Sequence, residues 1–190
     1  MPKKDMKRQL ADCLKALMTS TTIDKITIQD ITGKLNVNRQ TFYYHFKDIY
    51  DLLHWTLQQE AVTLLKDKES DQLWNEGVLA LFHYLEENKA FVLSTVQSLG
   101  VDQFKQFFYG EVYEIINSVT SKIGEEVHAE SRCIEFLTHF YTLALPTIAI
   151  SWIQGEIDIS AKEMIDMMDD TFKNQIYGAK YRLKHEKPET

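Results

Sequence analysis

The chain has 190 residues, 44% of them hydrophobic, which is enough for a substantial core in one large or two small domains. Its 7 glycines and 3 prolines are too few for the frequent turns of an all-β fold, and long periodic stretches predict an all-α protein. The net charge of −7 is unevenly distributed: residues 1–50 contain 9 Lys/Arg and 5 Asp/Glu, a net +4, while the remainder contains 12 and 23, a net −11. This distribution favours an anionic partner for the N-terminal part alone.

The N-terminal segment predicts a helix from about Asp5 to Ser20. Four basic residues before and at its start are candidate DNA contacts, although a solvated terminus would carry the same charges: Lys3, Lys4, Lys7 and Arg8. The two cysteines, Cys13 and Cys133, are far apart and form no C-x-x-C pair, so we expect buried, reduced thiols. The N-terminus lacks the apolar stretch of a signal peptide, and we therefore expect a cytoplasmic protein.

Two short helices joined by a turn are predicted next, over about 28–35 and 39–46. Thr27 and Asp30 have the spacing of a capping box at the start of the first helix, with Asp in place of the usual Glu or Gln. Asn38 is a suitable N-cap for the second helix, and the residues between the two helices are turn-like. This pattern is typical of a helix-turn-helix motif, but also of two ordinary short helices in a bundle.

The second of these short helices directs polar side chains away from the predicted core. Arg, Gln and Thr side chains can reach base edges in the major groove, and Tyr, His and Lys side chains suit phosphate oxygens. The candidates for base contacts are Arg39, Gln40, Thr41 and Tyr44, and those for phosphate contacts are Tyr43, His45 and Lys47.

The same helix contains a specific run of residues, Gln40-Thr41-Phe42-Tyr43-Tyr44-His45-Phe46-Lys47-Asp48, followed by Leu52-Leu53. The run resembles the N-terminal signature of TetR-type transcriptional regulators, and the resemblance covers residues 5 to about 60. It departs from the signature at Ile49, where a Lys is usual. The resemblance implies phosphate contacts by Thr27, Tyr43, His45 and Lys47, and base contacts by Arg39, Thr41 and Tyr44. Together with Asn38 and Gln40, these are the predicted DNA-binding residues.

The remainder of the chain predicts longer helices. One runs from Asp48 to about Lys66 with Tyr50 and Leu53 on its buried face, and a charged break, Lys66 to Asp71, follows it. The later helices cover about 72–88, 90–99, 104–123, 136–155 and 160–178, the last with a Ser160-x-x-Glu163 capping box. The predicted division is a helix-turn-helix DNA-binding domain over 1–47, a connecting helix over 48–66, and a helical regulatory and dimerisation domain over 67–190.

The stretch from Phe136 to Gly155 has no formal charge and the length of a membrane span. Its six polar residues and the central Pro146 argue against a membrane span. A helix that is apolar on most sides is instead typical of a helix buried within a larger protein assembly. The resemblance implies that the last two helices form a four-helix dimer interface; otherwise they complete the core of one subunit. The candidate interface residues are Leu143, Ile150, Trp152, Met164, Met168 and Phe172.

A small-molecule pocket in the second domain is also implied by the resemblance. Its candidate lining residues are Trp74, Phe82, Phe104, Phe107, Phe108, Tyr113, Phe136 and Phe140, each of which could instead be an ordinary core residue. A metal-sensing variant would use His83, His128, Cys133 or His139. Cys133 and His139 are six residues apart and do not form a tight helical pair, so we predict no metal site and no cofactor.

The function that the resemblance implies is a homodimer on a palindromic operator, repressing transcription until a small-molecule effector releases it. A narrower resemblance, carried by Arg39–Tyr43, Leu52-Leu53-x-Trp55 and Leu85-x-x-Asn88, is to the subgroup that includes regulators of dihydroxyacetone kinase operons, and implies an activator with a protein co-regulator. No G-x-G-x-x-G, P-loop, G-x-S-x-G or H-E-x-x-H pattern is present, so we expect no enzyme. A helical protein-interaction module without DNA binding is the rival of a different class, but it does not explain the basic N-terminal segment.

Overall fold

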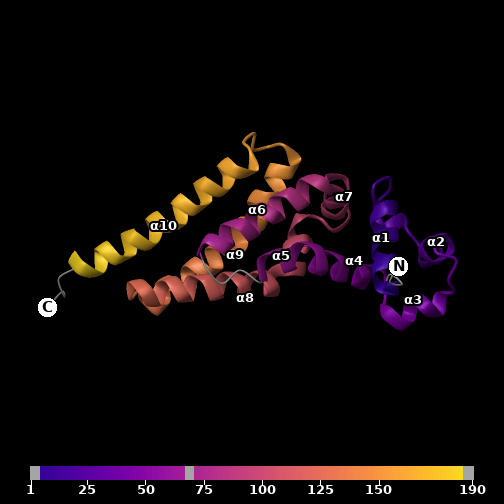
Figure 1. Ribbon diagram of the computed structural model, residues 1–190, viewed down its shortest axis with the longest axis horizontal. Coiled ribbons are helices and arrows are strands. Elements are labelled where there is room, and N and C mark those ends of the chain that lie inside the picture. Colours follow the sequence, from indigo (N-terminus) through magenta and orange to yellow (C-terminus); the bar gives the residue numbers. More distant parts are fainter. Residues whose placement is uncertain (1–4, 67–70, 186–190) are drawn as a thin grey trace. The chain divides into compact units, whose positions relative to one another are not determined.

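The computed structural model describes residues 5–66 and 71–185, and every regular element within these ranges is helical (Figure 1), which confirms the all-α prediction. The elements are, in chain order, α1 (Met6–Met18), η1 (Ile23–Lys25), α2 (Ile28–Lys34), α3 (Arg39–His45), α4 (Ile49–Leu57), η2 (Gln58–Val62), α5 (Thr63–Lys66), α6 (Asp71–Glu87), α7 (Lys89–Leu99), α8 (Val101–Val127), α9 (Ser131–Gln154) and α10 (Ala161–His185).

The chain forms two compact units. The first contains Met1–Thr63 and Tyr84–Phe107, and the second contains Leu64–His83 and Phe108–Thr190. The sequence-based division assigned all residues after 66 to the regulatory domain, whereas α7 and the end of α6 group with the N-terminal helices in the structure. The reason is that α7 packs against α1 and η1, with Phe91 and Val92 buried.

The core of the first unit joins α1 to the helix-turn-helix segment. Leu10 and Leu14 of α1 are buried together with Ile31 of α2 and Phe42 of α3, and Leu52 and Leu53 of α4 complete this core. Tyr50, which the sequence placed on the buried face of α4, is exposed instead, because the buried face passes through 52, 53, 56 and 57.

Two hydrogen bonds hold α7 against the segment that leads into α2. Ser94 Oγ donates to the carbonyl of Thr21 at 3.1 Å, and the backbone N–H of Ile23 donates to Ser98 Oγ at 3.2 Å. Because these bonds satisfy backbone groups of an irregular segment, they fix the approach to the helix-turn-helix motif.

The connecting helix predicted over 48–66 is helical throughout but not uniformly α-helical. Asp48 caps α4, since Asp48 Oδ1 accepts from the N–H of Asp51 at 2.8 Å. Residues 58–62 form the π-helical turn η2 between α4 and α5. Such single turns change the direction in which the following side chains point, and they are frequent at functional sites.

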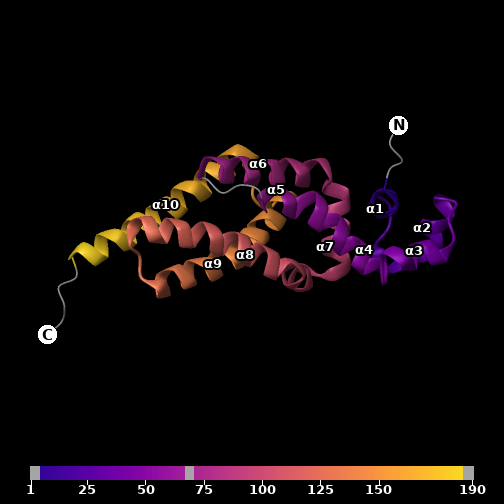
Figure 2. The same ribbon diagram turned by 60° about the horizontal axis from the view of Figure 1, so that its bottom comes forward.

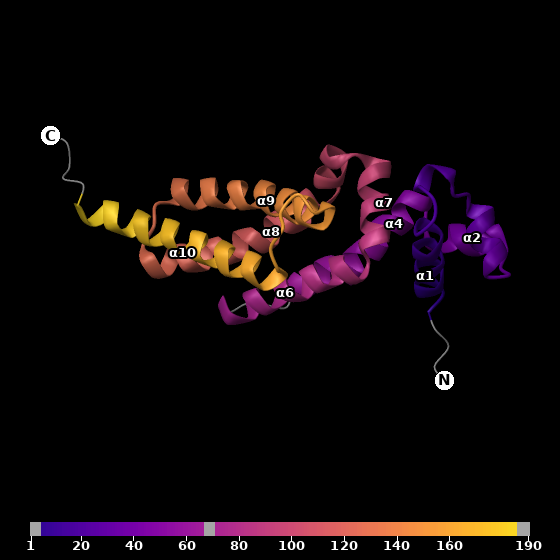
Figure 3. The same ribbon diagram turned by 90° about the horizontal axis from the view of Figure 1, so that it is seen from above.

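In the second unit, α8 and α9 run side by side, as the two rotated views show (Figures 2 and 3). Their shared core contains Ile116, Leu137 and Tyr141, and the hydroxyls of Thr120 and Thr138 meet inside it at 2.6 Å. Gly124 allows the close approach of the two helices, because a Cβ atom at this position would overlap the side chain of Ile134.

Helix α9 includes Pro146 and begins at Ser131, five residues before the predicted start. By length and composition it is apolar enough to cross a membrane, and 28% of its most apolar window is buried within the structure. Helices in protein cores satisfy the same test. The capping box before α10 is confirmed, since Ser160 Oγ accepts from the N–H of Glu163 and Glu163 accepts from the N–H of Ser160.

Candidate nucleic-acid interface

Helix α2 is fixed at its start by the predicted capping box. Thr27 Oγ1 accepts from the N–H of Asp30 at 3.2 Å, and Asp30 Oδ2 accepts from the N–H of Thr27 at 2.8 Å. Hydrogen bonds from the Thr27 side chain and backbone hold the pKa of Asp30 below its usual value. The Thr27 hydroxyl donates to Asp30, so Thr27 already has a structural role in the absence of DNA.

The turn between α2 and α3 depends on Asn36, whose φ of 53° lies in the left-handed region that Asn adopts more readily than most residues. The N–H of Val37 then donates to the carbonyl of Thr32 at 3.0 Å. Asn38 caps α3, with Oδ1 accepting from the N–H of Thr41 at 2.8 Å and from the Thr41 hydroxyl at 3.0 Å. The turn and its cap therefore set the orientation of α3 before any DNA is bound.

Helix α3 buries one face and exposes the other. Phe42 is fully buried and Phe46, directly after the helix, is also buried. On the other side, Tyr43 is exposed and Tyr44 is 85% exposed. Large aromatic side chains with a polar end rarely remain this exposed without a partner, and a phenol can both donate and accept hydrogen bonds.

The polar candidates of α3 lie at the same surface. Arg39, Gln40 and Lys47 are exposed, whereas Thr41 and His45 are half-buried. The backbone N–H of Lys47 donates to Asp51 at 2.9 Å, which fixes the chain between α3 and α4. The structure therefore brings the base-contact and phosphate-contact candidates together in the first unit. Among them, Thr27 and Asn38 are also helix caps, and the Thr41 hydroxyl donates to the Asn38 cap.

Gln29 of α2 is a residue that the sequence analysis missed. Its side-chain oxygen accepts a hydrogen bond from the Arg39 guanidinium at 3.0 Å, across the angle between α2 and α3. The two residues are ten positions apart and share no periodic pattern, so only the folded arrangement brings them together. A guanidinium held in one orientation loses less side-chain entropy when it binds a base.

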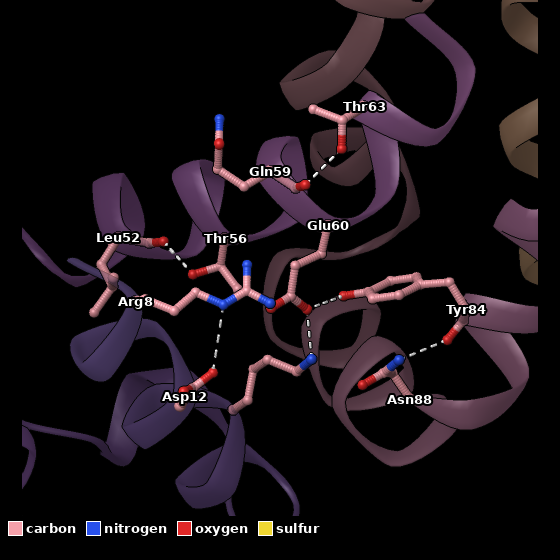
Figure 4. Close-up of polar contacts among 10 residues, drawn as sticks. Arg8, Asp12, Leu52, Thr56, Gln59, Glu60, Thr63, Tyr84 and Asn88 are labelled. Carbon is pink, nitrogen blue, oxygen red and sulfur yellow. Dashed lines mark hydrogen bonds and ion pairs between the residues drawn. The ribbon is translucent and has the colours of Figure 1, made fainter. Parts of the chain in front are cut away.

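The basic residues at the start of α1 have partners within the protein. Lys7 Nζ lies over the rings of Phe46 and Trp55, at 5.7 and 5.8 Å from their centroids. Arg8 forms an ion pair with Glu60 at 3.1 Å (Figure 4). Arg8, one of the sequence-predicted candidates for DNA contact, therefore pairs with a buried carboxylate of the first unit while its own side chain stays 44% exposed. The candidates Lys3 and Lys4 lie outside the described residues.

Several residues predicted for a pocket or a dimer interface belong to the core of a single chain. Ile150 and Met164 are buried, and the half-buried Trp152 packs its ring 5.0 Å from that of Phe82 and donates its N–H to the carbonyl of Ile159. These three residues pack within one subunit, as the alternative in the sequence analysis allowed, and the role of the last two helices in a dimer stays a prediction.

The other candidates are divided between core and surface. Phe108 is buried, while Phe104, Tyr113 and Met168 are half-buried. Phe136, Phe140 and Leu143 are exposed, so the two phenylalanines do not line the interior of one chain as the pocket prediction required. The side chains of Trp74, Phe107 and Phe172 lie outside the part of the chain that the structure describes.

Three exposed large hydrophobic residues of α9 lie along one side of the helix, and we name them the apolar stripe (Phe136, Phe140 and Leu143). They lie at i, i+4 and i+7, and the rings of the two phenylalanines stack with centroids 6.2 Å apart. An exposed apolar strip of this kind is a candidate surface for contact with another protein. Among the residues that the structure describes, no group of three or more His, Cys, Asp or Glu is placed to hold a metal ion.

Comparison with known proteins identifies similar sequences and folds. A curated relative, the dhaKLM operon transcriptional activator DhaS of Lactococcus lactis, is 33% identical over 82 residues, which span 43% of this chain and 44% of that protein. The chain therefore aligns with less than half of this relative's length.

Three solved structures share the fold. The structure of a dihydroxyacetone kinase operon activator DhaS has a TM-score of 0.70 at 24% identity and covers 91% of this chain and 97% of that one. The TetR-family repressor AlkX from Dietzia sp. has a TM-score of 0.54 at 12% identity, covering 95% and 100%. A TetR-family regulator from Streptomyces coelicolor has a TM-score of 0.56 at 13% identity, covering 99% and 92%.

A family model decides the assignment. The model for the C-terminal region of TetR-type transcriptional regulators matches residues 72–174, which is more than half of the chain. This match lies outside the helix-turn-helix segment on which the sequence resemblance rested, so the two assignments are independent. The chain belongs to the TetR family of transcriptional regulators.

Proposed function

We propose that the protein binds DNA in a sequence-specific manner as a homodimer and thereby regulates transcription in the cytoplasm. The observation that carries the proposal is the exposed face of α3, which presents four side chains that can form hydrogen bonds: Arg39, Gln40, Tyr43 and Tyr44. Asn38 caps the start of α3, and Asp48 caps the start of the following helix, α4. Arg and Gln are the side chains that read G and A edges in the major groove. The net +4 of residues 1–50 supplies the attraction to phosphates.

Dimerisation is the second part of the proposal. A helix-turn-helix motif reads only a few base pairs, and two copies related by a twofold axis read a palindrome with much higher affinity. The apolar stripe of α9 supports a contact between copies, because its three side chains are exposed in the single chain. Among the interface residues predicted from sequence, Leu143 is the one that fits this role best.

The direction of regulation and its signal are the third part. Repression released by a small molecule is the first candidate, and it follows from the sequence resemblance. Activation with a protein co-regulator is the second candidate, and the similarity to an operon activator of Lactococcus lactis favours activation. A reporter gene distinguishes them: an activator raises expression from a site upstream of the promoter, whereas a repressor lowers expression from a site that overlaps it.

Selection from a pool of random DNA duplexes tests DNA recognition directly. We expect enrichment of a palindrome whose half-sites lie about one helical turn apart. Enrichment without a common sequence, or none at all, would contradict sequence-specific recognition and favour a helical protein-interaction module. Because the pool contains all short sequences, a negative result does not depend on guessing the target gene.

A further inference from the structure

A histidine lies on the same face of α9 as the apolar stripe. Phe136, His139, Phe140 and Leu143 are spaced at i, i+3, i+4 and i+7, which is the spacing of one helical face. At about 100° per residue, these four positions lie within about 100° of one another around the helix. All four side chains are exposed in the single chain. A second helix that packs along the apolar stripe would therefore also cover His139.

Two half-buried tyrosines of α8 hold the His139 ring in place. The Tyr109 hydroxyl oxygen lies 2.8 Å from His139 Nδ1, and the Tyr113 ring centroid lies 5.3 Å from that of His139. The rings of Tyr109 and Tyr113 stack on each other with centroids 5.9 Å apart. All three residues belong to the second unit, and the aromatic surface of α9 thus continues onto α8.

The hydrogen bond between Tyr109 and His139 is compatible with both charge states of the imidazole. When the hydroxyl donates to Nδ1, the ring is neutral and carries its proton on Nε2. When the ring takes up a second proton, Nδ1 becomes a donor and the hydroxyl can accept. Protonation therefore keeps this contact and changes the charge at the apolar face. Histidine side chains undergo this change between about pH 5 and 8.

Few charged groups lie near His139. It forms no ion pair with any residue that the structure describes. Glu135 is exposed one turn before His139 on α9 and would offset part of the cost of a charged ring. Helix α10 contacts α9 through Tyr141, about 160° around the helix from His139, so it packs on another side. The charged residues nearest to the tyrosines and the histidine along α8 and α9 are Lys105, Glu111, Glu114, Arg132 and Glu135.

The distribution of charge favours a second copy of the chain as the partner of this face. Residues 51–190 carry a net −11, so two copies repel each other over most of this region. The stretch from Phe136 to Gly155 has no formal charge while His139 is neutral, and it allows the closest approach of two copies. Protonation of His139 would place a charge in this uncharged stretch.

We propose that His139 makes the contact between two copies sensitive to acid, so that the dimer forms with a neutral ring and weakens when the ring is protonated. Contact with the partner's apolar side chains would remove water from an imidazolium, and a twofold contact brings one from each copy. Dissociation is then linked to proton uptake, so the dissociation constant rises as the pH falls through the range of histidine titration and is constant above it. The inference rests on the proposed dimer contact through the apolar stripe.

Sedimentation equilibrium of the full chain at about pH 8 and about pH 5.5 tests this inference. For the unaltered protein we expect a dissociation constant at least about tenfold higher at the lower pH. His139→Gln keeps a polar side chain that takes up no proton, and its dissociation constant should change by less than about twofold between the two pH values. His139→Lys carries a charge at both values and should dimerise weakly at both. A His139→Gln dimer as weak as the His139→Lys dimer, or one with the full pH response, would overturn the proposal.

His128→Asn is the matched control. His128 is exposed between α8 and α9, and its φ of 57° lies in the left-handed region that Asn adopts readily. This variant should keep the full pH response, and its loss here would overturn the proposal by showing that the response does not come from His139. An unaltered protein that is monomeric at both pH values would contradict the proposed dimer and the inference with it. A dimer with the same dissociation constant at both values would overturn the inference alone.

Discussion

Helices α3 and α9 both bury one face and expose aromatic residues on another, but the chemistry of the two exposed faces differs. On α3, Tyr43 and Tyr44 stand beside Arg39 and Gln40, so every exposed side chain can form hydrogen bonds. The apolar stripe of α9 has no hydrogen-bonding group at all. The difference supports the two partners that we propose, a polar, charged duplex for α3 and an apolar surface, such as the same helix in a second copy, for α9.

The largest expected effect concerns α9. Phe140→Glu puts a charge in the middle of the apolar stripe, and we expect the dimer dissociation constant to rise at least about a hundredfold, because a carboxylate would be buried without a partner. Sedimentation equilibrium measures this change. Ser118→Glu adds the same charge at an exposed position of α8 and should leave the dimer intact. A dimer that survives Phe140→Glu would show that the stripe is not the interface.

A slightly smaller effect, on the free energy of unfolding, is expected for a substitution in α8, the helix that packs against α9. Gly124→Ala would force a Cβ atom into Ile134 and should lower the free energy of unfolding by about 1–3 kcal/mol. Gly110→Ala is the same substitution in α8 with no atom nearby, and it should raise the free energy of unfolding by about 0.5–1 kcal/mol through helix propensity. Urea unfolding measures both, and equal effects would contradict the close packing of α8 on α9.

Two substitutions in and directly after α3 are expected to change DNA affinity in different ways, one through base recognition and the other through phosphate binding. Arg39→Ala should lower the preference for the selected duplex over random DNA by about 1–3 kcal/mol if its guanidinium reads a guanine. Lys47→Ala should weaken binding to both duplexes about equally. Fluorescence anisotropy on the two duplexes measures these values. Equal losses on both duplexes for Arg39→Ala would refute its base-reading role.

The smallest expected effect concerns the residue that orients Arg39. Gln29→Ala should lower the same preference by about 0.5–1.5 kcal/mol, the usual contribution of one hydrogen bond. In the Arg39→Ala background the substitution should have little further effect if Gln29 acts through Arg39. A full loss in that background would mean that Gln29 acts on DNA directly.

The sequence predicted those features that depend on neighbouring residues. The capping box of Thr27 and Asp30 and the Asn38 cap are local, and the structure confirms them. Features that depend on distant residues were not predictable. The Gln29–Arg39 bond, the Arg8–Glu60 ion pair and the hydrogen bonds of α7 join positions from ten to 75 apart. The uncharged run in α9 could not indicate which residues face the core, so Ile150 and Leu143 were given one role although only Leu143 is exposed.

The central claim is that two copies of this chain read one DNA site through α3. Fluorescence anisotropy of the selected duplex, titrated with protein at several salt concentrations and with random DNA as the control, tests it most directly. The account predicts tight binding that weakens steeply with salt, a clear preference over random DNA, and saturation at two subunits per site or a multiple of two. Saturation at one subunit per site, or equal affinity for the two duplexes, would contradict it.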